Sequence, residues 1–332
     1  MDLRQLHAIV AIAEHGSFSA AADALQTVQS NISTHVKKLE HELGTELVDR
    51  ATGELTEAGG LVVSRARRVM SEIDAMSADV TALSHEVAGT VRLGVIGTAA
   101  RWIVPSLIEI VPERHPLLHL VFVEATTAGL GDQLASGQVD LGVLGLPAAG
   151  GDLRTVPLFE EDLVLVLPKS HPLAEQPLVR LTDLPDLPLL LPLRGVAYRD
   201  EIDAVTAAQH VELRPRVEMD SIRLIAALTF EGCGFAILPS GAVSERRNQD
   251  WALIPVEGLT PRLVGVAQRR RGLPSAPVRA VLQILQDIVS DGTRTPRGIR
   301  PVPFDLTRFG TPEQDRREGR VADRGSGLLS AG

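Results

Sequence analysis

The sequence has a single cysteine, Cys233, in 332 residues. One thiol cannot form a disulfide within its own chain, and such a composition is typical of a reducing compartment. No apolar run approaches the roughly 20 residues that a membrane-spanning helix needs. The N-terminus begins with an acid, Asp2, and lacks the charged and then apolar segments of a secretory signal. These absences predict a soluble cytoplasmic protein with no membrane partner.

The chain also lacks an excess of basic charge, since 33 Lys and Arg stand against 42 Asp and Glu, a net charge of −9. Binding to nucleic acid would therefore depend on a local patch and not on the field of the whole protein. The length and a hydrophobic content of 44% are sufficient for two or three domains with buried cores.

Three short apolar stripes at helical spacing occupy residues 3–13, 18–25 and 28–44. Ser17 stands where it can cap the second helix, and Thr27 lies in a short turn before the third. The third segment, VQSNISTHVKKLEHELG, has amide, hydroxyl and lysine side chains between its apolar positions. Such groups can hydrogen-bond base edges or phosphates, although the same pattern suits an ordinary amphipathic helix with a polar outer face.

A long helix is predicted for the linker that follows, residues 59–88. Its apolar residues recur alternately four and three positions apart, without proline, through about four heptads. This pattern favours pairing with a second helix by knobs-into-holes packing, and packing onto its own domain is the alternative. The residues expected at the dimer contact are Val62, Val69, Ile73, Met76, Val80 and Leu83.

From residue 89 onward, short apolar strands alternate with helices, as in TVRLGVIG, ARWIVPSLIEIV and LHLVFVEA. The alternation predicts an α/β domain over residues 89–291 with a parallel sheet and right-handed crossovers. A second alternation over roughly residues 163–265 predicts a second subdomain inserted in the first. Residues 292–332 are rich in Arg, Gly, Pro, Asp and Ser without periodicity, so we expect a disordered tail there.

Residues 21–40, AADALQTVQSNISTHVKKLE, resemble the LysR-type transcriptional regulators, and the segments ELGTELVDR and LTEAGG extend the match. The resemblance covers residues 1–290. It implies an N-terminal all-α winged helix-turn-helix over residues 1–58 and antiparallel pairing of the linker helices. It also implies a periplasmic-binding-protein-like effector domain, whose two subdomains hold a small molecule between them.

By the same resemblance, the third helix is the recognition helix and Arg50 lies at the base of the wing. A recognition helix fits the major groove, where its side chains reach base edges. The resemblance implies a dimer or tetramer that binds double-stranded DNA and contacts RNA polymerase. The residues expected at the DNA are Ser17, Thr27, Gln29, Ser30, Asn31, Ser33, Thr34, Lys37, Lys38 and Arg50.

Two features depart from the family pattern. Thr34 stands where a longer polar or basic residue is common, and the short wing carries Glu54 where basic residues are common. Residues 1–57 also hold four basic and nine acidic side chains, a net charge of −5. We therefore expect modest non-specific affinity, with Lys37 and Lys38 as the main phosphate anchors and short hydrogen bonds setting the sequence preference.

In two-lobed α/β domains, ligands lie in the cleft beyond the carboxyl ends of the strands. The residues that we expect at the effector are Thr98, Thr126, Thr127, Arg194 and Tyr198. Threonines and an arginine suit an anionic effector, although each threonine could instead cap a helix and Arg194 could be a surface charge.

Nothing in the sequence points to catalysis, a cofactor or a metal. Cys233 has no histidine and acid at a recognised spacing, so we interpret it as an ordinary thiol. The sequence predicts a ligand-responsive, sequence-specific DNA-binding regulator and not an enzyme. The alternative is a cytoplasmic small-molecule-binding protein or enzyme with an N-terminal interaction module.

Overall fold

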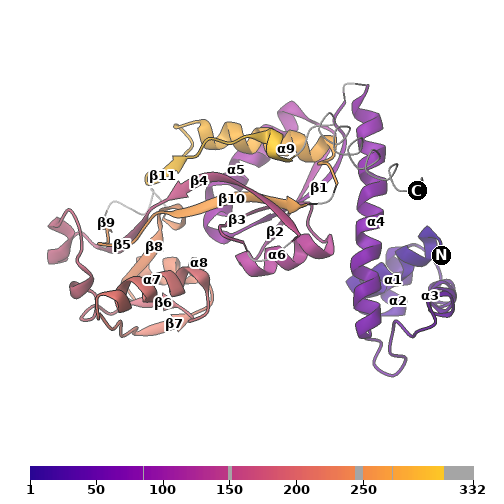
Figure 1. The fold of residues 1–332 in the computed structure, drawn as a ribbon, viewed down its shortest axis with the longest axis horizontal. Helices are drawn as coiled ribbons and strands as arrows, with labels where there is room; N and C mark the ends of the chain where they lie inside the picture. Colours follow the sequence, from indigo (N-terminus) through magenta and orange to yellow (C-terminus); the bar gives the residue numbers. More distant parts are fainter. Residues whose placement is uncertain (85, 149–151, 244–249, 271, 310–332) are drawn as a thin grey trace, which may run out of the picture.

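The computed structural model describes residues 1–84, 86–148, 152–243, 250–270 and 272–309. Figure 1 shows an N-terminal helical domain, a long helix beside it, and a C-terminal α/β domain that we call the effector domain. Among the described residues, no helix has the length and hydropathy needed to cross a membrane.

The N-terminal domain contains α1 (Leu3–His15), α2 (Phe18–Ala24) and α3 (Gln29–Leu43). Their apolar stripes meet in one buried core, which confirms the predicted helical unit. Asp2 begins α1 as a capping box with Gln5. Ser17 caps α2 by accepting from the Ala20 amide at 3.1 Å. These caps fix the angles at which the short helices enter the core.

A short wing follows α3. Val48 and Leu55 form an antiparallel bridge, and the turn between them is closed by the Asp49 carboxylate, which accepts from the Ala51 amide at 2.7 Å. Gly53 takes a φ of +77°, a left-handed conformation that favours glycine.

The linker helix α4 (Glu57–Ala82) begins at Thr56, whose hydroxyl accepts from the Gly59 amide at 3.0 Å. Its first turns pack into the N-terminal core. The helix ends six residues before the predicted bound of 88, so Leu83 is the cap residue and not part of the helix. Val87 packs against the effector-domain core instead of continuing the stripe. The heptad spacing alone does not show where the helix ends, because an apolar residue of the following domain can fall at the next position of the pattern.

The first subdomain contains a six-stranded sheet with the strand order β11-β4-β10-β3-β1-β2. The strands are β1 (Gly89–Val95), β2 (Leu118–Glu124), β3 (Leu141–Gly145), β4 (Leu153–Glu161), β10 (Arg262–Arg269) and β11 (Ile299–Pro301). Helices α5 (Gly97–Arg114) and α9 (Ala276–Ser290) cover one face and α6 (Thr127–Ser136) the other (Figure 1).

The predicted parallel pairing holds for β1 with β2 and β3, whereas β10 pairs antiparallel with both β3 and β4, and β11 pairs antiparallel with β4. The physical reason is the insertion of the second subdomain. The chain leaves the first subdomain through β4 and returns through β10, so these two strands must point in opposite directions.

The second subdomain lies between Glu161 and Arg262, close to the predicted bounds of 163 and 265. Its antiparallel sheet has the order β8-β5-β9, and a separate parallel pair is formed by β6 and β7. The elements are β5 (Leu163–Pro168), η1 (Pro172–Glu175), η2 (Leu181–Asp183), β6 (Leu190–Pro192), α7 (Ala197–Ala208), β7 (Val217–Met219), α8 (Ile222–Phe230), β8 (Ala236–Pro239), η3 (Ser240–Ala242) and β9 (Trp251–Pro255).

The prediction of a disordered tail over residues 292–332 is wrong for its first part. Strand β11 pairs with β4, and a 3-10 helix, η5 (Leu306–Phe309), follows it. Ile299 and Phe309 are buried in the first core. A three-residue edge strand and two anchoring apolar residues need no periodicity, so composition alone misses them. Residues 310–332 lie outside the described residues.

Two adjacent glycines of α4 allow a matched test of how α4 meets the wing. A Cβ on Gly59 would stand 2.0 Å from the Leu47 carbonyl oxygen, whereas a Cβ on Gly60 would meet nothing within 4 Å. We expect Gly59→Ala to destabilise the protein by about 1–3 kcal/mol, as overpacking does. Gly60→Ala should stabilise it by up to about 1 kcal/mol, through helix propensity.

Urea unfolding followed by circular dichroism measures both variants of this pair. Equal stability of the two alanine variants would mean that α4 does not lie against Leu47.

Candidate functional site

The outer face of α3 carries free polar side chains. Gln29, Ser30, Lys37 and Lys38 are exposed, and within the described residues none of these four side chains has a hydrogen bond or ion pair. Val28, which precedes the helix, provides no side-chain cap. The Asn31 backbone amide donates to the Val28 carbonyl at 3.0 Å, and no side chain caps the amides before it, where a phosphate oxygen could bind.

Other residues predicted at the DNA are engaged within the domain. The Asn31 amide donates to the Thr27 hydroxyl at 3.0 Å, and the Thr34 hydroxyl donates to the Ser30 carbonyl at 2.7 Å. Ser17 caps α2, and Ser33 is half-buried. Asn31 and Thr34 therefore each use a donor within the domain, whereas Thr27 and Ser17 accept and keep their hydroxyl donors.

Arg50 lies at the wing base, where its guanidinium is held from two sides. It donates to the Glu40 carboxylate at 2.6 Å, and its Cζ lies 5.5 Å from the centre of the Phe18 ring. The other Glu40 oxygen accepts from the buried Leu47 amide at 3.0 Å. Glu40 therefore joins α3 to the wing.

Some of the acids around α3 therefore form hydrogen bonds within the domain and are not free to repel DNA. Glu42 accepts from the N-terminal ammonium and from the Gln5 amide, and the first of these hydrogen bonds lowers the pKa of its carboxyl. Glu40 and Glu42 are two of the nine acids in the net charge of residues 1–57, although each has a partner within the domain. No signal in the sequence joins Glu40 to a partner ten residues away.

At the junction of the subdomains, Thr98 belongs to a buried polar network. Its hydroxyl accepts from Arg262 Nη2 at 2.8 Å, and Arg262 Nε donates to Glu161 at 2.8 Å. Thr98 and Glu161 are both buried. The residues come from α5 and from the two crossing strands, so the network lies where the subdomains are joined. Arg101 of α5 adds a hydrogen bond to the Gly241 carbonyl.

A second contact between the subdomains is an ion pair on the surface. Arg223 of α8 pairs with Glu124 at the end of β2, and both side chains are exposed. Gly97 lies directly beneath them, since a Cβ there would stand 2.8 Å from the Glu124 carboxylate and 2.9 Å from Arg223 Cδ. Sequence reasoning placed a ligand at this end of β1 and β2 but did not find this ion pair.

The other residues predicted at the effector do not converge on one point. The Thr126 hydroxyl accepts from the Gly129 amide at 3.2 Å and so caps α6. A helix cap was the alternative to effector binding for this threonine. Thr127 accepts from the Gly145 amide at 3.2 Å and so ties α6 to β3. Tyr198 is buried and donates to a backbone carbonyl of β8, and burial raises its pKa.

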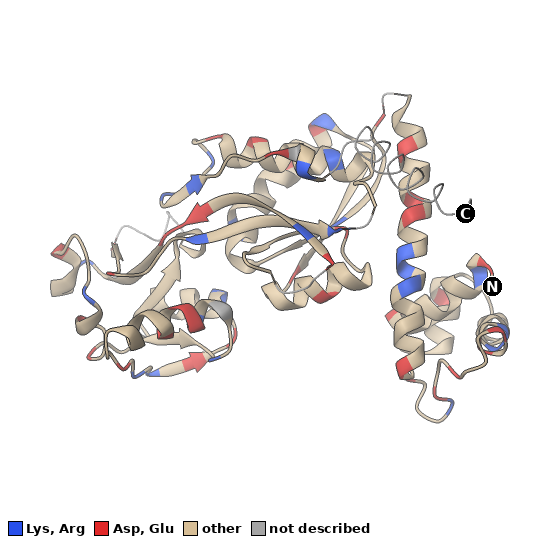
Figure 2. Ribbon diagram, in the orientation of Figure 1, with Lys and Arg blue, Asp and Glu red and all other residues tan. Residues whose placement is uncertain are grey.

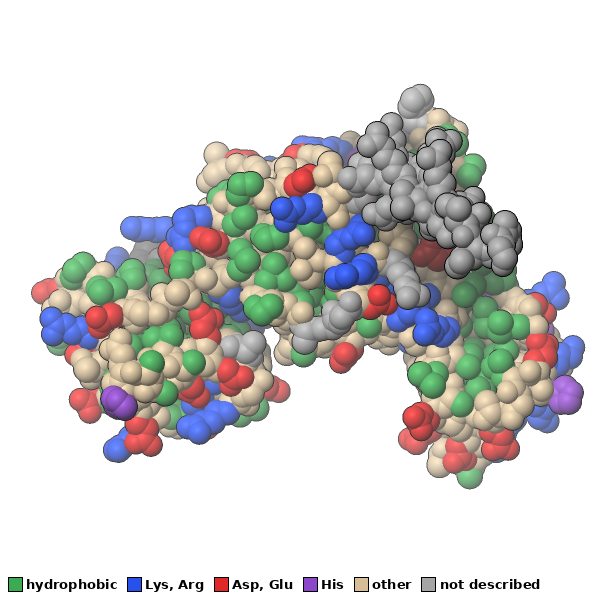
Figure 3. Space-filling view, viewed as in Figure 1, with side chains coloured by type: hydrophobic (Ala, Val, Ile, Leu, Met, Phe, Trp, Pro, Cys, Tyr) green, Lys and Arg blue, Asp and Glu red, His purple; other side chains and the backbone are tan. Residues whose placement is uncertain are grey.

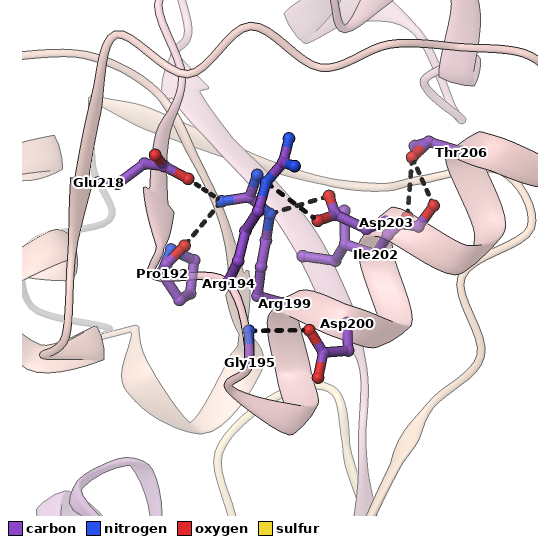
Figure 4. Close-up of polar contacts among 9 residues, drawn as sticks. All are labelled: Pro192, Arg194, Gly195, Arg199, Asp200, Ile202, Asp203, Thr206 and Glu218. Carbon is purple, nitrogen blue, oxygen red and sulfur yellow. Dashed lines mark hydrogen bonds and ion pairs between the residues drawn. The ribbon is translucent and has the colours of Figure 1, made fainter.

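Arg194 is exposed, with Nε 4.0 Å from Asp203, beside a second arginine that sequence reasoning missed (Figure 4). The Arg199 side chain is fully buried and donates to Asp203 at 2.8 Å, to Glu218 at 2.6 Å and to the Pro192 carbonyl at 2.7 Å. Burial acts to lower its pKa, but the hydrogen bonds to the two carboxylates outweigh burial and raise it. Arg199 thus ties α7 to β6 and β7.

Two family models match the chain. "Bacterial regulatory helix-turn-helix protein, lysR family" matches residues 3–60, and "LysR substrate binding domain" matches residues 84–290. The chain belongs to the LysR family. It is a DNA-binding transcriptional regulator with a LysR-type effector domain.

Known proteins resemble this LysR-family chain over most of its length. The "Probable hydrogen peroxide-inducible genes activator" of Streptomyces viridosporus is 32% identical over 296 residues, which cover 87% of this chain and 95% of that protein. A full-length OxyR variant from Pseudomonas aeruginosa is 28% identical with a TM-score of 0.68, covering 86% and 97%. CbnR in complex with its target DNA is 24% identical with a TM-score of 0.62, covering 86% and 99%, and supports the fold.

The linker helix of this LysR-family chain has two different faces. Within one chain the predicted dimer face is largely uncovered, with Val69, Met76 and Val80 exposed at 44%, 61% and 62%, and Val62 and Ile73 half-buried. The opposite face docks onto the effector domain, where the Asp79 carboxylate accepts from the first amide of α9 at 2.6 Å.

Across the described residues, no group of three or more His, Cys, Asp or Glu side chains could hold a metal ion. Cys233 is an exposed free cysteine after α8.

An acid near α3 can act through its negative charge or through its hydrogen bonds to the wing, and two alanine variants separate these effects. Glu40→Ala leaves the buried Leu47 amide without its acceptor, which should cost about 1–3 kcal/mol of stability, and it frees the wing. We expect this variant to bind DNA more weakly. Glu46→Ala also removes one negative charge, but from an exposed side chain, and should bind slightly more tightly.

Fluorescence anisotropy with labelled duplex DNA, read beside thermal unfolding, measures both variants. If the two variants bound DNA equally tightly, Glu40 would act by charge alone.

Proposed function

We propose that this LysR-family regulator works in the cytoplasm as a homo-oligomer that reads a specific double-stranded DNA site through α3 and is not an enzyme. The observation that carries the proposal is the outer face of α3, where Gln29, Ser30, Lys37 and Lys38 are exposed and have no side-chain partner among the residues that the structure describes. A promoter-bound regulator of this kind can also contact RNA polymerase.

In this proposal, Gln29, Ser30 and Ser33 set sequence preference and the two lysines anchor the phosphates. Gln29 has both the donor and the acceptor that adenine requires in the major groove. Arg50 plays a smaller part than the family pattern implies, because Glu40 already neutralises it. The short acidic wing adds little minor-groove binding.

Loss of Lys37 or Lys38 should weaken binding to every sequence. Each lysine-to-alanine variant is expected to reduce the salt dependence of log K by about 0.9, because one fewer counterion is released. Gln29→Ala should instead reduce discrimination between the operator and other DNA, by about 1–3 kcal/mol. The operator is first located by retardation of the DNA beside the protein's own gene.

Anisotropy titrations over a range of KCl, with operator and scrambled duplexes, measure both effects. Lys169→Ala, in the second subdomain, is the matched control and should behave as the wild type. If Gln29→Ala kept full operator preference, a different face of α3 would read the bases.

The uncovered stripe of α4 supports the homo-oligomer. Exposed valine and methionine side chains in a heptad register are the pattern by which two helices pair. We propose that a second copy of α4 covers Val62, Val69, Ile73, Met76 and Val80, and that the cap residue Leu83 extends the contact.

Charge placed on this stripe should dissociate the assembly. Met76→Asp together with Val80→Asp is expected to give a smaller particle with unchanged circular dichroism, because both side chains are exposed in the single chain. Thr81→Asp, an exposed neighbour outside the stripe, should retain the wild-type mass.

Light scattering coupled to size exclusion gives the mass of each variant. A mass unchanged by the paired substitution would rule out the stripe as the interface.

The effector is proposed to be a small anion bound between the subdomains. Arg223 is an exposed cation whose partner, Glu124, lies on the other subdomain. An anionic ligand could replace Glu124 at Arg223 and so change how the subdomains are held together. The hydroxyls of Thr98, Thr126 and Thr127 already accept hydrogen bonds within the protein, so we assign them a smaller part in binding than Arg223. Arg194 lies 4.0 Å from Asp203, within the second subdomain.

Hydrogen peroxide is a second candidate signal, because the relatives named above include peroxide-inducible activators. An intrachain disulfide cannot form here, since Cys233 is the one cysteine of the sequence. We therefore favour a bound small molecule over a disulfide switch.

A further inference from the structure

A cavity of about 450 Å³ lies between the linker helix and the effector domain. It is formed at the start of β1, the end of β10 and the first residues of α9, opposite the end of the sheet where the subdomains meet. Its volume falls within the about 300–1,000 Å³ of small-molecule pockets. In Figure 1 this is the place where α4 passes the edge of the effector domain.

The two walls of the cavity carry opposite charge. The α4 wall contributes Glu72 and Asp74, in the acidic half of α4 (Figure 2). The effector-domain wall contributes Arg92 and Arg269. Figure 3 shows the effector domain and the N-terminal domain as two bodies on either side of this junction. In the part of the chain that the structure describes, none of these four side chains forms an ion pair.

One polar side chain between the walls is open to the cavity. Gln268 lines the cavity with 5% of its surface exposed, and its side chain has no hydrogen bond within the described residues. The Gln268 amide is therefore available to a ligand in the cavity. Gln268 can both donate to a carboxylate and accept from an ammonium.

Asp140, at the start of β3, also faces the cavity. It accepts from the Arg92 backbone amide at 2.8 Å. Burial raises the pKa of its carboxyl, with Asp74 acting in the same direction and Arg92 and Arg269 opposing it. A cation bound beside Asp140 and Asp74 would offset this loss of hydration.

We propose that this cavity binds a small zwitterion, a molecule of amino-acid size that bears one ammonium and one carboxylate. The ammonium lies beside Asp74 and Asp140, the carboxylate beside Arg269, and Gln268 hydrogen-bonds between them. A simple anion would leave the acids of α4 unpaired, and a simple cation would leave the arginines unpaired.

The walls of the cavity are held together without a ligand. Asp79 of α4 accepts from the Ala276 amide at 2.6 Å, and Arg68 of α4 donates to the Ala135 carbonyl at 2.9 Å. Because the walls belong to α4 and to the effector domain, a ligand here binds only their docked arrangement. An effect of this ligand on DNA binding rests on the proposed function, whereas binding of the ligand to the cavity does not.

Thermal unfolding of the full chain with each common L-amino acid at millimolar concentration tests the site. At least one amino acid should raise Tm in a saturable way, because a ligand that binds the folded state stabilises it. Propionate and propylamine, which carry one charge each, should raise Tm less. Arg269→Gln and Asp74→Asn should each weaken the apparent Kd about tenfold or more.

The matched controls are Arg65→Gln and Asp132→Asn, exposed side chains outside the cavity, which should bind as the wild type. If a cavity variant fails to fold, Ala78→Met, which fills the cavity from α4, should abolish the response. The proposal is overturned if no amino acid raises Tm, if the cavity variants bind as the wild type, or if propionate alone has the full effect. Failure of DNA binding would leave the Tm result unchanged, so the two proposals fail separately.

Discussion

The molecule depends on one helix meeting three different partners. α4 inserts its first turns into the N-terminal core, places Asp79 on the first amide of α9, and leaves a hydrophobic stripe uncovered. The Asp79 contact combines a charged hydrogen bond with the positive end of a 15-residue helix, and so helps to hold α4 against the effector domain. Within one chain, α4 is thus in contact with both the N-terminal core and the effector domain.

Much of this architecture follows from sequence periodicity. The heptad stripe predicts a long helix, and alternating strands and helices predict the α/β domain, because burial of one face imposes those spacings. The ends of elements are less predictable. Val87 continues the heptad spacing but belongs to the next core, and Phe309 anchors a segment that composition marks as disordered. In both cases a single apolar residue packs against a core whose other members are distant in sequence.

The candidate sites show the same limit more clearly. The exposed residues of α3 could be found from the sequence, because a helix has an outside and polar residues occupy it. The roles of Glu40, Arg199 and Glu124 could not, because each depends on a charged partner on another element. Thr98 was predicted to face a ligand, and the structure pairs it with Arg262. A polar residue after a strand can satisfy the protein itself as readily as a ligand.

The strands that cross between the subdomains have a mechanical consequence. β4 and β10 pair along their length, with a bulge between Val264 and Gly265, where a Cβ would meet the Val156 carbonyl oxygen at 2.6 Å. A two-stranded ribbon resists stretching and shear through its hydrogen bonds but twists and bends readily, most of all at a bulge. We therefore expect the two subdomains to move relative to each other mainly by twisting and bending of this β4–β10 ribbon. A ligand that binds both subdomains far from the ribbon would then resist this twisting more than one that binds close to it.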